Sequence, residues 1–290
     1  MANTRQLKRR INTAANISKI TKAMEMVSAS KMRRAQQQAL SARPYTRAIQ
    51  RSLRKVAQFT DSSLHPLLMT HEMGKDVLVI FSTDRGLCGG LNTNLFKAAI
   101  QWTNGRDAFE VIVIGKKAVT FAKKMGFQIA AQFTEMPEVA SVNEILALAR
   151  LTTDGFLKTE YRSVWLLHMD FINTLTQQVK LTPILPLSAE LAEIEHGQVN
   201  PEIHSEYTFE PNPQAILGEL LPYYLESSLF QTLLEAKASE HSARMVAMKN
   251  ASDNAKSLVS ELKLQFNKSR QASITNELLD ITTATMTVTQ

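Results

Sequence analysis

The positions of the glycines divide this chain into three parts. All ten glycines lie between Gly74 and Gly218, and prolines are rare outside this interval. Because Gly and Pro are the residues that most disfavour a helix interior, their absence predicts two long helical ends around a turn-rich middle. We therefore expect a helical shaft built from residues 1–60 and 222–290, and a globular domain over residues 61–221.

The C-terminal end shows the pattern of a coiled coil. Residues 223–290 contain neither Gly nor Pro and, at about 1.5 Å per residue, would extend on the order of 100 Å as one helix. Apolar and small residues recur every three or four positions, which is typical of a seam that packs on another helix. The expected seam comprises Leu234, Ala238, His241, Met245, Met248, Ala251, Ala255, Leu258, Leu262, Phe266 and Ser269.

The N-terminal end carries a matching seam. It comprises Leu7, Ile11, Ala14, Ile17, Thr21, Met24, Val27 or Ser28, Met32, Ala35 and Ala39. Neither seam is broad enough to be buried alone, so the two ends are predicted to pair. The middle connects the end of one helix to the start of the other, which makes the pair antiparallel and leaves roughly 20 Å of C-terminal helix unpaired. Whether the N-terminal helix bends at Pro44 stays open.

The middle alternates between strand and helix patterns. Continuous apolar runs at 76–82 and 110–114 are typical of buried parallel strands, and further strands are expected at 163–169 and 178–187. Helical patterns cover 91–102, 116–125 and 142–159. The predicted fold class is therefore mixed: a long antiparallel coiled coil plus a doubly wound α/β domain.

Charge is concentrated on the first helix. Residues 1–60 carry a net charge of +13, residues 61–222 carry −7 and the remainder is neutral. Such a helix favours an acidic partner, which could be nucleic acid, anionic lipid or an acidic protein surface; a solvated face is an equal alternative. Aromatic interleaving and zinc-finger or helix-turn-helix patterns are missing. A basic coiled-coil nucleic-acid-binding protein remains the alternative function. No apolar run reaches the length of a membrane span.

The residues indicate no catalytic, cofactor or metal site. Residues 83–91 (TDRGLCGGL) lie where phosphate loops occur but match neither common phosphate-binding motif, so a tight turn with Asp84 and Arg85 paired or capping is favoured over a nucleotide site. Cys88 has no nearby histidine, which favours a buried inert thiol over a nucleophile. The histidines show no metal-ligand spacing; they are His65, His71, His168, His196, His204 and His241.

Four blocks of sequence resemble the gamma subunits of F-type ATP synthases. They are residues 20–35 (ITKAMEMVSASKMRRA), 82–92 (STDRGLCGGLN), 239–249 (SEHSARMVAMK) and 268–278 (KSRQASITNEL). The blocks follow the family's order and span both ends and the middle, so the resemblance covers the whole chain. Its length and blocks are similar to those of bacterial members, and it lacks the cysteine-containing insert of chloroplast members.

The resemblance implies a central-stalk rotor subunit without a catalytic site of its own. In this family the coiled coil stands inside a ring of three alpha and three beta subunits, and the α/β domain sits with epsilon on the membrane c-ring. Proton-driven rotation is coupled to ATP synthesis at the beta subunits, and Mg-ATP and ADP are bound by alpha and beta. The implied location is peripheral, on the cytoplasmic face of the bacterial inner membrane, with no nucleic-acid partner.

The resemblance also implies which residues contact the partners. Coupling contacts with beta are expected at Met24, Arg244, Arg270, Gln271 and Thr275. The apolar end of the C-terminal helix, with Ile281, Met286 and Val288, is expected to sit in an alpha–beta bearing. From the residues alone, exposed intrahelical ion pairs are the preferred explanation of both Arg244 and Arg270.

Overall fold

The computed structural model describes residues 2–57, 65–188 and 209–288, and their side chains over 5–57, 65–188 and 209–282. Contacts divide the chain into two compact units. Met1–Ala29 and Arg244–Gln290 form the first, which we name the stalk unit, and Ser30–Ala243 form the second, the sheet unit. Two long helices, α1 (Ala2–Ala57) and α6 (Pro213–Val288), contribute to both units.

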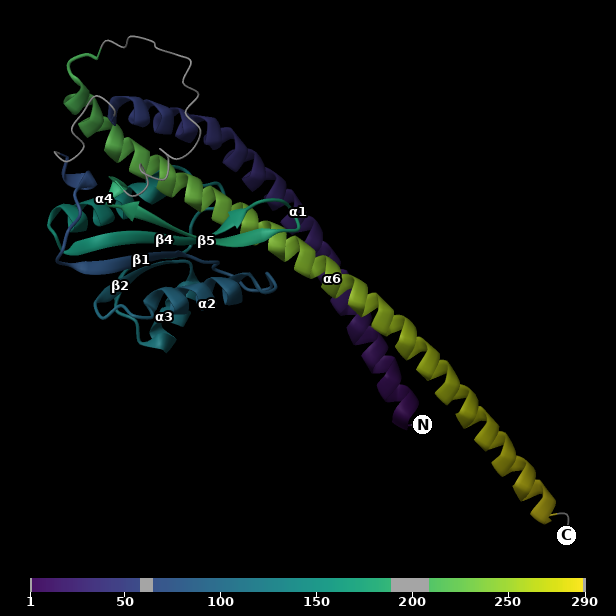
Figure 1. The fold of residues 1–290 in the computed structure, drawn as a ribbon. Coiled ribbons are helices and arrows are strands. Elements are labelled where there is room, and N and C mark those ends of the chain that lie inside the picture. Colours follow the sequence, from purple (N-terminus) through teal and green to yellow (C-terminus); the bar gives the residue numbers. More distant parts are fainter. Residues whose placement is uncertain (1, 58–64, 189–208, 289–290) are drawn as a thin grey trace. The chain divides into compact units, whose positions relative to one another are not determined.

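The sheet unit is built on five strands in the order β3-β2-β1-β4-β5 (Figure 1). The first four strands in this order are parallel, and β5 pairs antiparallel with β4. The strands are β1 (Lys75–Phe81), β2 (Phe109–Ile114), β3 (Ile129–Phe133), β4 (Tyr161–Phe171) and β5 (Gln177–Leu185). The remaining helices are η2 (Pro66–Leu68), α2 (Leu91–Thr103), α3 (Lys116–Met125) and α4 (Asn143–Leu157).

Helices cover both faces of this sheet. On one face Leu78 and Ile80 of β1 share a core with Leu95 of α2 and with α3 (Figure 1). On the other face Val77 and Val79 of β1 share a core with α4, with the second half of α1 and with the first part of α6. Strand β1 is apolar from Val77 to Phe81 because this part is buried from both sides. The expected doubly wound α/β arrangement is confirmed.

Strand β3 was missed by the sequence analysis. It forms the edge of the sheet, and its five residues alternate between half-buried and exposed. Its partly buried residues alternate with exposed ones, so it lacks the continuous apolar run that predicted β1 and β2. The other predicted strands and helices of the middle are present with ends shifted by a few residues.

Prolines do not end the long helices. Helix α1 continues through Pro44 to Ala57. Helix α6 begins at Pro213, so the expected start near residue 222 is wrong, and both Gly218 and Pro222 lie inside it. Two residues close to Pro222, Leu221 and Tyr224, are fully buried in the core of the sheet unit. This burial offsets the backbone hydrogen bond that proline cannot make.

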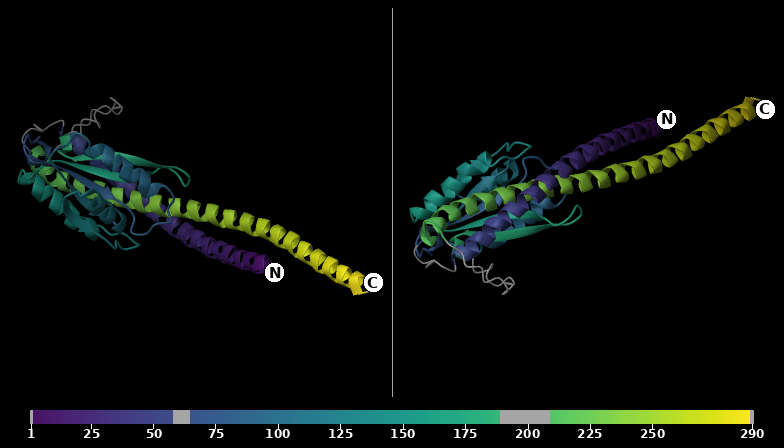
Figure 2. Two further views of the ribbon diagram at one scale, coloured as in Figure 1. Left: turned by 90° about the horizontal axis from the view of Figure 1, so that it is seen from below. Right: turned by 90° about the horizontal axis from the view of Figure 1, so that it is seen from above.

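The stalk unit is an antiparallel pair formed by the first half of α1 and the second half of α6. Ser18 and Ser252 face one another, and α6 continues past the N-terminal end of α1 (Figure 2). Most seam predictions hold, but Ile17 and Leu258 are 48% and 44% exposed and are wrong. Among the side chains of this unit that the structure describes, the buried ones are Leu7, Ala14, Thr21, Ser28, Arg244, Met248, Ser252, Ala255 and Leu262.

Candidate functional site

The expected contact residues that the structure describes all lie in the stalk unit. Arg270, Gln271 and Thr275 are exposed on α6, beyond the part that pairs with α1. The Thr275 hydroxyl donates to the Gln271 carbonyl at 3.0 Å, so the two residues share one face of the helix. Met24 is half-buried on α1.

Arg244 is buried, which contradicts its interpretation as an exposed member of an ion pair. Its relative exposure is 9%, which classes it with the buried residues. The register set by Ser18 and Ser252 in an antiparallel pair brings Arg244 to nearly the same level as Met24. Met24 and Arg244 therefore lie at about the same height along the helix pair. Arg270, Gln271 and Thr275 lie several helical turns away along α6.

The far part of α6 has more exposed apolar residues than the sequence analysis selected. Ile281 is 63% exposed, as expected for a tip. The side chains of Met286 and Val288 lie outside the described residues. Ile274, Leu278 and Leu279 were missed and are 49%, 58% and 58% exposed. The sequence contained this signal. These three large apolar residues lie beyond the end of the partner helix, so they cannot be buried in the seam between the two helices.

A second apolar stripe runs along α1. Ile17, Ile20 and Val27 are 48%, 59% and 56% exposed, and their spacing places them with Met24 on one side of the helix. The buried seam of the same helix passes instead through Ala14, Thr21 and Ser28. The first half of α1 thus has a face of mostly small residues against α6 and an adjacent, exposed apolar face that a partner can cover.

The glycine-containing loop after β1 is held by its own side chains. Asp84 Oδ1 accepts hydrogen bonds from the backbone N–H of Lys116 at 3.0 Å, at the start of α3, and of Glu135 at 3.4 Å. Thr83 donates to the Arg85 carbonyl at 2.7 Å and accepts from Asn92 at 2.8 Å. The capping role expected for Asp84 is confirmed, and these contacts are those of a structural turn.

The thiol of Cys88 is buried, as expected. It is 3% exposed, and its sulfur accepts a hydrogen bond from Asn92 Nδ2 at 3.4 Å. A thiolate nucleophile requires access and a nearby base or positive charge. Besides Asn92, the thiol packs into the apolar core that α2 and α3 form with the sheet.

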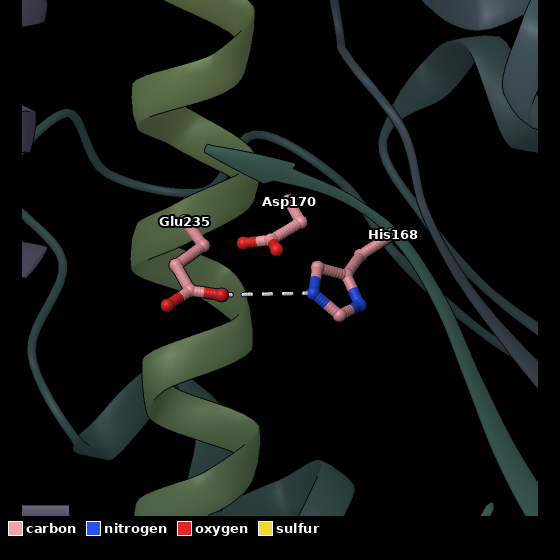
Figure 3. Close-up of side chains that lie close together, drawn as sticks. All are labelled: His168, Asp170 and Glu235. Carbon is pink, nitrogen blue, oxygen red and sulfur yellow. Dashed lines mark ion pairs between the residues drawn. The ribbon is translucent and has the colours of Figure 1, made fainter. Parts of the chain in front are cut away.

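One cluster of ionisable groups was not predicted. His168 and Asp170 on β4 and Glu235 on α6 place one possible ligand atom each within 4.8 Å of one another in the sheet unit (Figure 3). His168 and Glu235 are 67 positions apart in sequence, so no local spacing could signal this group. Of the other histidines, His196 and His204 lie outside the described residues.

Burial and neighbouring charges act in opposite directions on the two carboxyl groups of this cluster. Burial alone would raise the pKa of Glu235, but His168, Gln231 and Arg43 together lower that pKa well below its usual range. Burial raises the pKa of Asp170, and the negative charge of Glu235 raises it further, with Lys180 opposing. A buried carboxyl pair of this kind favours a shared positive charge or proton.

Comparison with known proteins identifies the family. The family model described as ATP synthase matches residues 3–288. Proteins named ATP synthase gamma chain from Glaesserella parasuis and Actinobacillus succinogenes are 39% and 40% identical over 285 and 286 residues, which cover 97% of this chain and 98% of each relative. This chain belongs to the ATP synthase gamma-chain family. The gamma chain of Pasteurella multocida is likewise 40% identical over 285 residues.

Solved structures support the same fold for this gamma-chain family member. A chain of the Euglena gracilis mitochondrial ATP synthase superposes with a TM-score of 0.67 at 19% identity, covering 99% of this chain and 94% of that one. A chain from the central stalk and c-ring of the Tetrahymena thermophila enzyme gives 0.60 at 24% identity, covering 80% and 99%. Among the described residues, no helix is long and apolar enough to cross a membrane.

Proposed function

We propose that this chain is the central-stalk rotor subunit of a bacterial F-type ATP synthase, which couples proton-driven rotation to ATP synthesis on other subunits. The full-length likeness to bacterial gamma chains carries this proposal, because it spans 98% of the relatives as well as nearly all of this chain. The structural neighbours belong to the central stalk and the rotor of mitochondrial ATP synthases.

The shaft of this rotor would comprise residues 1–60 and 222–290, with residues 61–221 as the globular domain. We assign the shaft to the interior of a ring of three alpha and three beta subunits, and the globular domain to epsilon and the c-ring. The exposed stripe of Ile17, Ile20 and Val27 supports this assignment. These apolar side chains lie beside the face of α1 that pairs with α6, and they remain exposed. An exposed apolar stripe fits a surrounding protein surface better than the phosphate backbone of a nucleic acid.

Two kinds of contact, for bearing and for coupling, would lie at different positions along α6. An apolar tip with Ile281, Met286 and Val288 suits a bearing, because specific hydrogen bonds would favour one rotational angle. The polar side chains of Arg270, Gln271 and Thr275 suit coupling, because only contacts that differ between angles can shift the equilibrium of a neighbouring beta subunit. Met24 and Arg244 would contribute at a second level of the shaft.

The nucleotide chemistry would take place on the partners. We assign Mg-ATP and ADP to sites on alpha and beta, and no catalytic role to this chain. The structural turn at residues 83–91 supports this view, since Asp84 and Thr83 use their side chains to hold the turn. The complex would place the chain on the cytoplasmic face of the inner membrane as a peripheral subunit.

Purification of the complex from its native membrane tests the proposal. An affinity tag on the chain should recover alpha and beta subunits at a ratio of 3:3:1, with epsilon and the c-ring in detergent. Recovery of the chain without alpha and beta would overturn the rotor proposal. Salt-sensitive recovery of DNA or RNA in their place would favour the nucleic-acid-binding alternative.

A further inference from the structure

The strongest feature that the rotor proposal leaves unexplained is the buried cluster of His168, Asp170 and Glu235. Strand β4 supplies the first two residues and α6 supplies the third, all within the sheet unit. Figure 3 shows the Glu235 carboxylate directed at the imidazole of His168, with the Asp170 carboxylate beside both. One ligand atom from each residue lies within 4.8 Å of the other two.

His168 is buried without a hydrogen-bond partner. Its exposure is 3%, and neither Nδ1 nor Nε2 has a partner within the described residues. The Nε2 atom lies 3.7 Å from Glu235 Oε2, which is beyond hydrogen-bond distance. A buried polar atom that is left unpaired costs free energy. A ligand bound between Nε2 of His168 and the carboxylates would remove this cost.

The two oxygens of Glu235 have different surroundings. Oε1 accepts a hydrogen bond from Gln231 Nε2 at 2.8 Å and is 3.3 Å from Arg43 Nη2. Oε2 is the oxygen that faces His168. Carboxylates that bind metals are commonly held in this way, with one oxygen fixed by an outer partner while the other meets the ion.

We propose that His168, Asp170 and Glu235 bind one divalent transition-metal ion, with Zn²⁺ as the best-fitting ion. An imidazole nitrogen with two carboxylate oxygens suits zinc-class ions, whereas Ca²⁺ and Mg²⁺ prefer oxygen ligands throughout. Two donors bound tetrahedrally to one zinc lie about 3.4 Å apart. The present 3.7 Å between Nε2 and Oε2 needs only a small adjustment to reach that separation.

The ion would fasten α6 to β4 within the sheet unit and leave one coordination position for water. Arg43 and Lys180 both approach the carboxylates, Arg43 at Glu235 and Lys180 at Asp170. Their positive charges reduce the attraction for a cation, so we expect an affinity below that of a Cys-rich structural zinc site. The proposal is independent of the rotor assignment, because binding to the isolated chain involves no ATP synthase partner.

Calorimetric titration of the metal-free full-length chain with Zn²⁺ tests the site. We expect one Zn²⁺ per chain, and a visible spectrum of four-coordinate Co²⁺ when Co²⁺ replaces zinc. Asp170→Asn keeps the size of the side chain but removes a charged ligand, and we expect it to weaken binding by at least about tenfold. His71→Gln is the matched control, since His71 is a second histidine with a buried, unpaired Nε2 in the same unit.

The outcomes are distinguishable. Binding of one equivalent that Asp170→Asn weakens and His71→Gln leaves within twofold supports the site. His168→Gln, checked for native circular dichroism, should then also lose the Co²⁺ spectrum. Failure of the wild-type chain to bind Zn²⁺, or equal affinity in the wild type and Asp170→Asn, would overturn the proposal and indicate that water fills the space between these groups.

Discussion

Ser18 and Ser252 donate their hydroxyls to each other's backbone carbonyl oxygens across the stalk unit, each at 3.3 Å. A side-chain hydroxyl can reach the backbone of the opposite helix only where the two helices lie close together. About one turn away along both helices, the small residues Ala14 and Ala255 are buried at the same interface. The close approach of α1 and α6 at this level therefore depends on side-chain volume more than on apolar character.

Ser252→Leu should destabilise the stalk unit. A leucine adds volume where Ser18 already contacts the opposite backbone, and overpacking of this kind costs about 1–3 kcal/mol. Thermal unfolding followed by circular dichroism measures the loss. Ser260→Leu is the control, because Ser260 is exposed on the same helix and the substitution there should change stability by less than about 0.5 kcal/mol. Equal stability of the two variants would contradict the close-approach interpretation.

Gly155→Ala should destabilise the chain, although alanine usually stabilises a helix interior. A Cβ at Gly155 would lie 2.3 Å from Cε2 of Tyr161, whose ring is buried. Helix propensity favours alanine by about 1 kcal/mol, but the clash requires the ring to move and should cost about 1–3 kcal/mol. Urea denaturation of the full chain gives the net effect.

The control for this prediction is a double variant. Tyr161→Leu removes the atoms nearest the added methyl group, so Gly155→Ala should be less harmful in that background than in the wild type. Additive effects of the two substitutions would show that the ring does not limit this position.

Asp76 should make stability depend on acid pH. Its carboxylate accepts hydrogen bonds from Arg162 Nε at 3.0 Å and from Ser163 Oγ at 2.6 Å, and Arg106 approaches at 3.5 Å. Burial by itself would raise the pKa of Asp76, but these partners outweigh burial and lower that pKa below its ordinary value of 3.8. The unfolded chain therefore binds a proton at a pH where the folded chain does not, which makes unfolding easier as the pH falls.

The contribution of Asp76 should be complete above about pH 5, and it should be lost as the pH falls below 3.8 towards the folded-state pKa. Asp76→Asn should cost about 1–3 kcal/mol at neutral pH and flatten the decline in acid. Asp253→Asn, which alters an exposed ion pair with Lys256 at 3.4 Å, should cost less than about 1 kcal/mol. A parallel acid decline in the wild type and Asp76→Asn would count against this assignment.

Arg270→Ala combined with Gln271→Ala should weaken coupling or assembly of the complex without unfolding the chain. Both side chains are exposed, so the unfolding free energy should change by less than about 0.5 kcal/mol per substitution. ATP-driven proton pumping in membrane vesicles should fall, while the nucleotide sites on beta stay intact. Lys263→Ala, exposed on the same helix outside the predicted contact group, is the control. Unchanged proton pumping in the double variant would contradict the proposed coupling role of Arg270 and Gln271.

Ile20→Ser should impair assembly with the surrounding subunits while leaving the isolated chain stable. Ile20 is 59% exposed, so the chain itself loses little apolar burial. If a partner covers the stripe, an apolar anchor there can contribute more than about 1 kcal/mol to binding. Lys19→Ser, at an adjacent exposed position, should assemble normally. Comparison of subunit recovery after affinity purification distinguishes the two variants.

Much of the fold could be read from local patterns. Strands β1 and β2 were predicted because burial from both faces gives each a continuous apolar run, Val77–Phe81 and Val111–Ile114. Strand β3 could not be found in this way, because two of its five residues are exposed and the other three are only partly buried. The start of α6 was misplaced because Pro222 and Gly218 are unfavourable in an isolated helix, and only the packing of their neighbours against the sheet compensates for them.

The candidate sites show the same distinction between what local patterns predict and what only packing decides. Exposure of Arg270 and Ile281 followed from their position beyond the paired part of α6. Burial of Arg244 did not follow, because the charge of a residue says nothing about which side of a helix meets its partner. The cluster of His168, Asp170 and Glu235 was invisible, because a strand and a helix distant in sequence bring these residues together only after folding.

The sequence by itself determined that two breaker-poor ends pair as antiparallel helices around an α/β middle, because helix propensity and seam spacing act over a few neighbouring residues. Tertiary structure alone decided the level at which the helices meet, set by Ser18 against Ser252, and which apolar residues of α1 remain uncovered. It also brought an unpaired imidazole to two carboxylates. Those outcomes depend on which surfaces meet in space, and no local pattern along the chain encodes that choice.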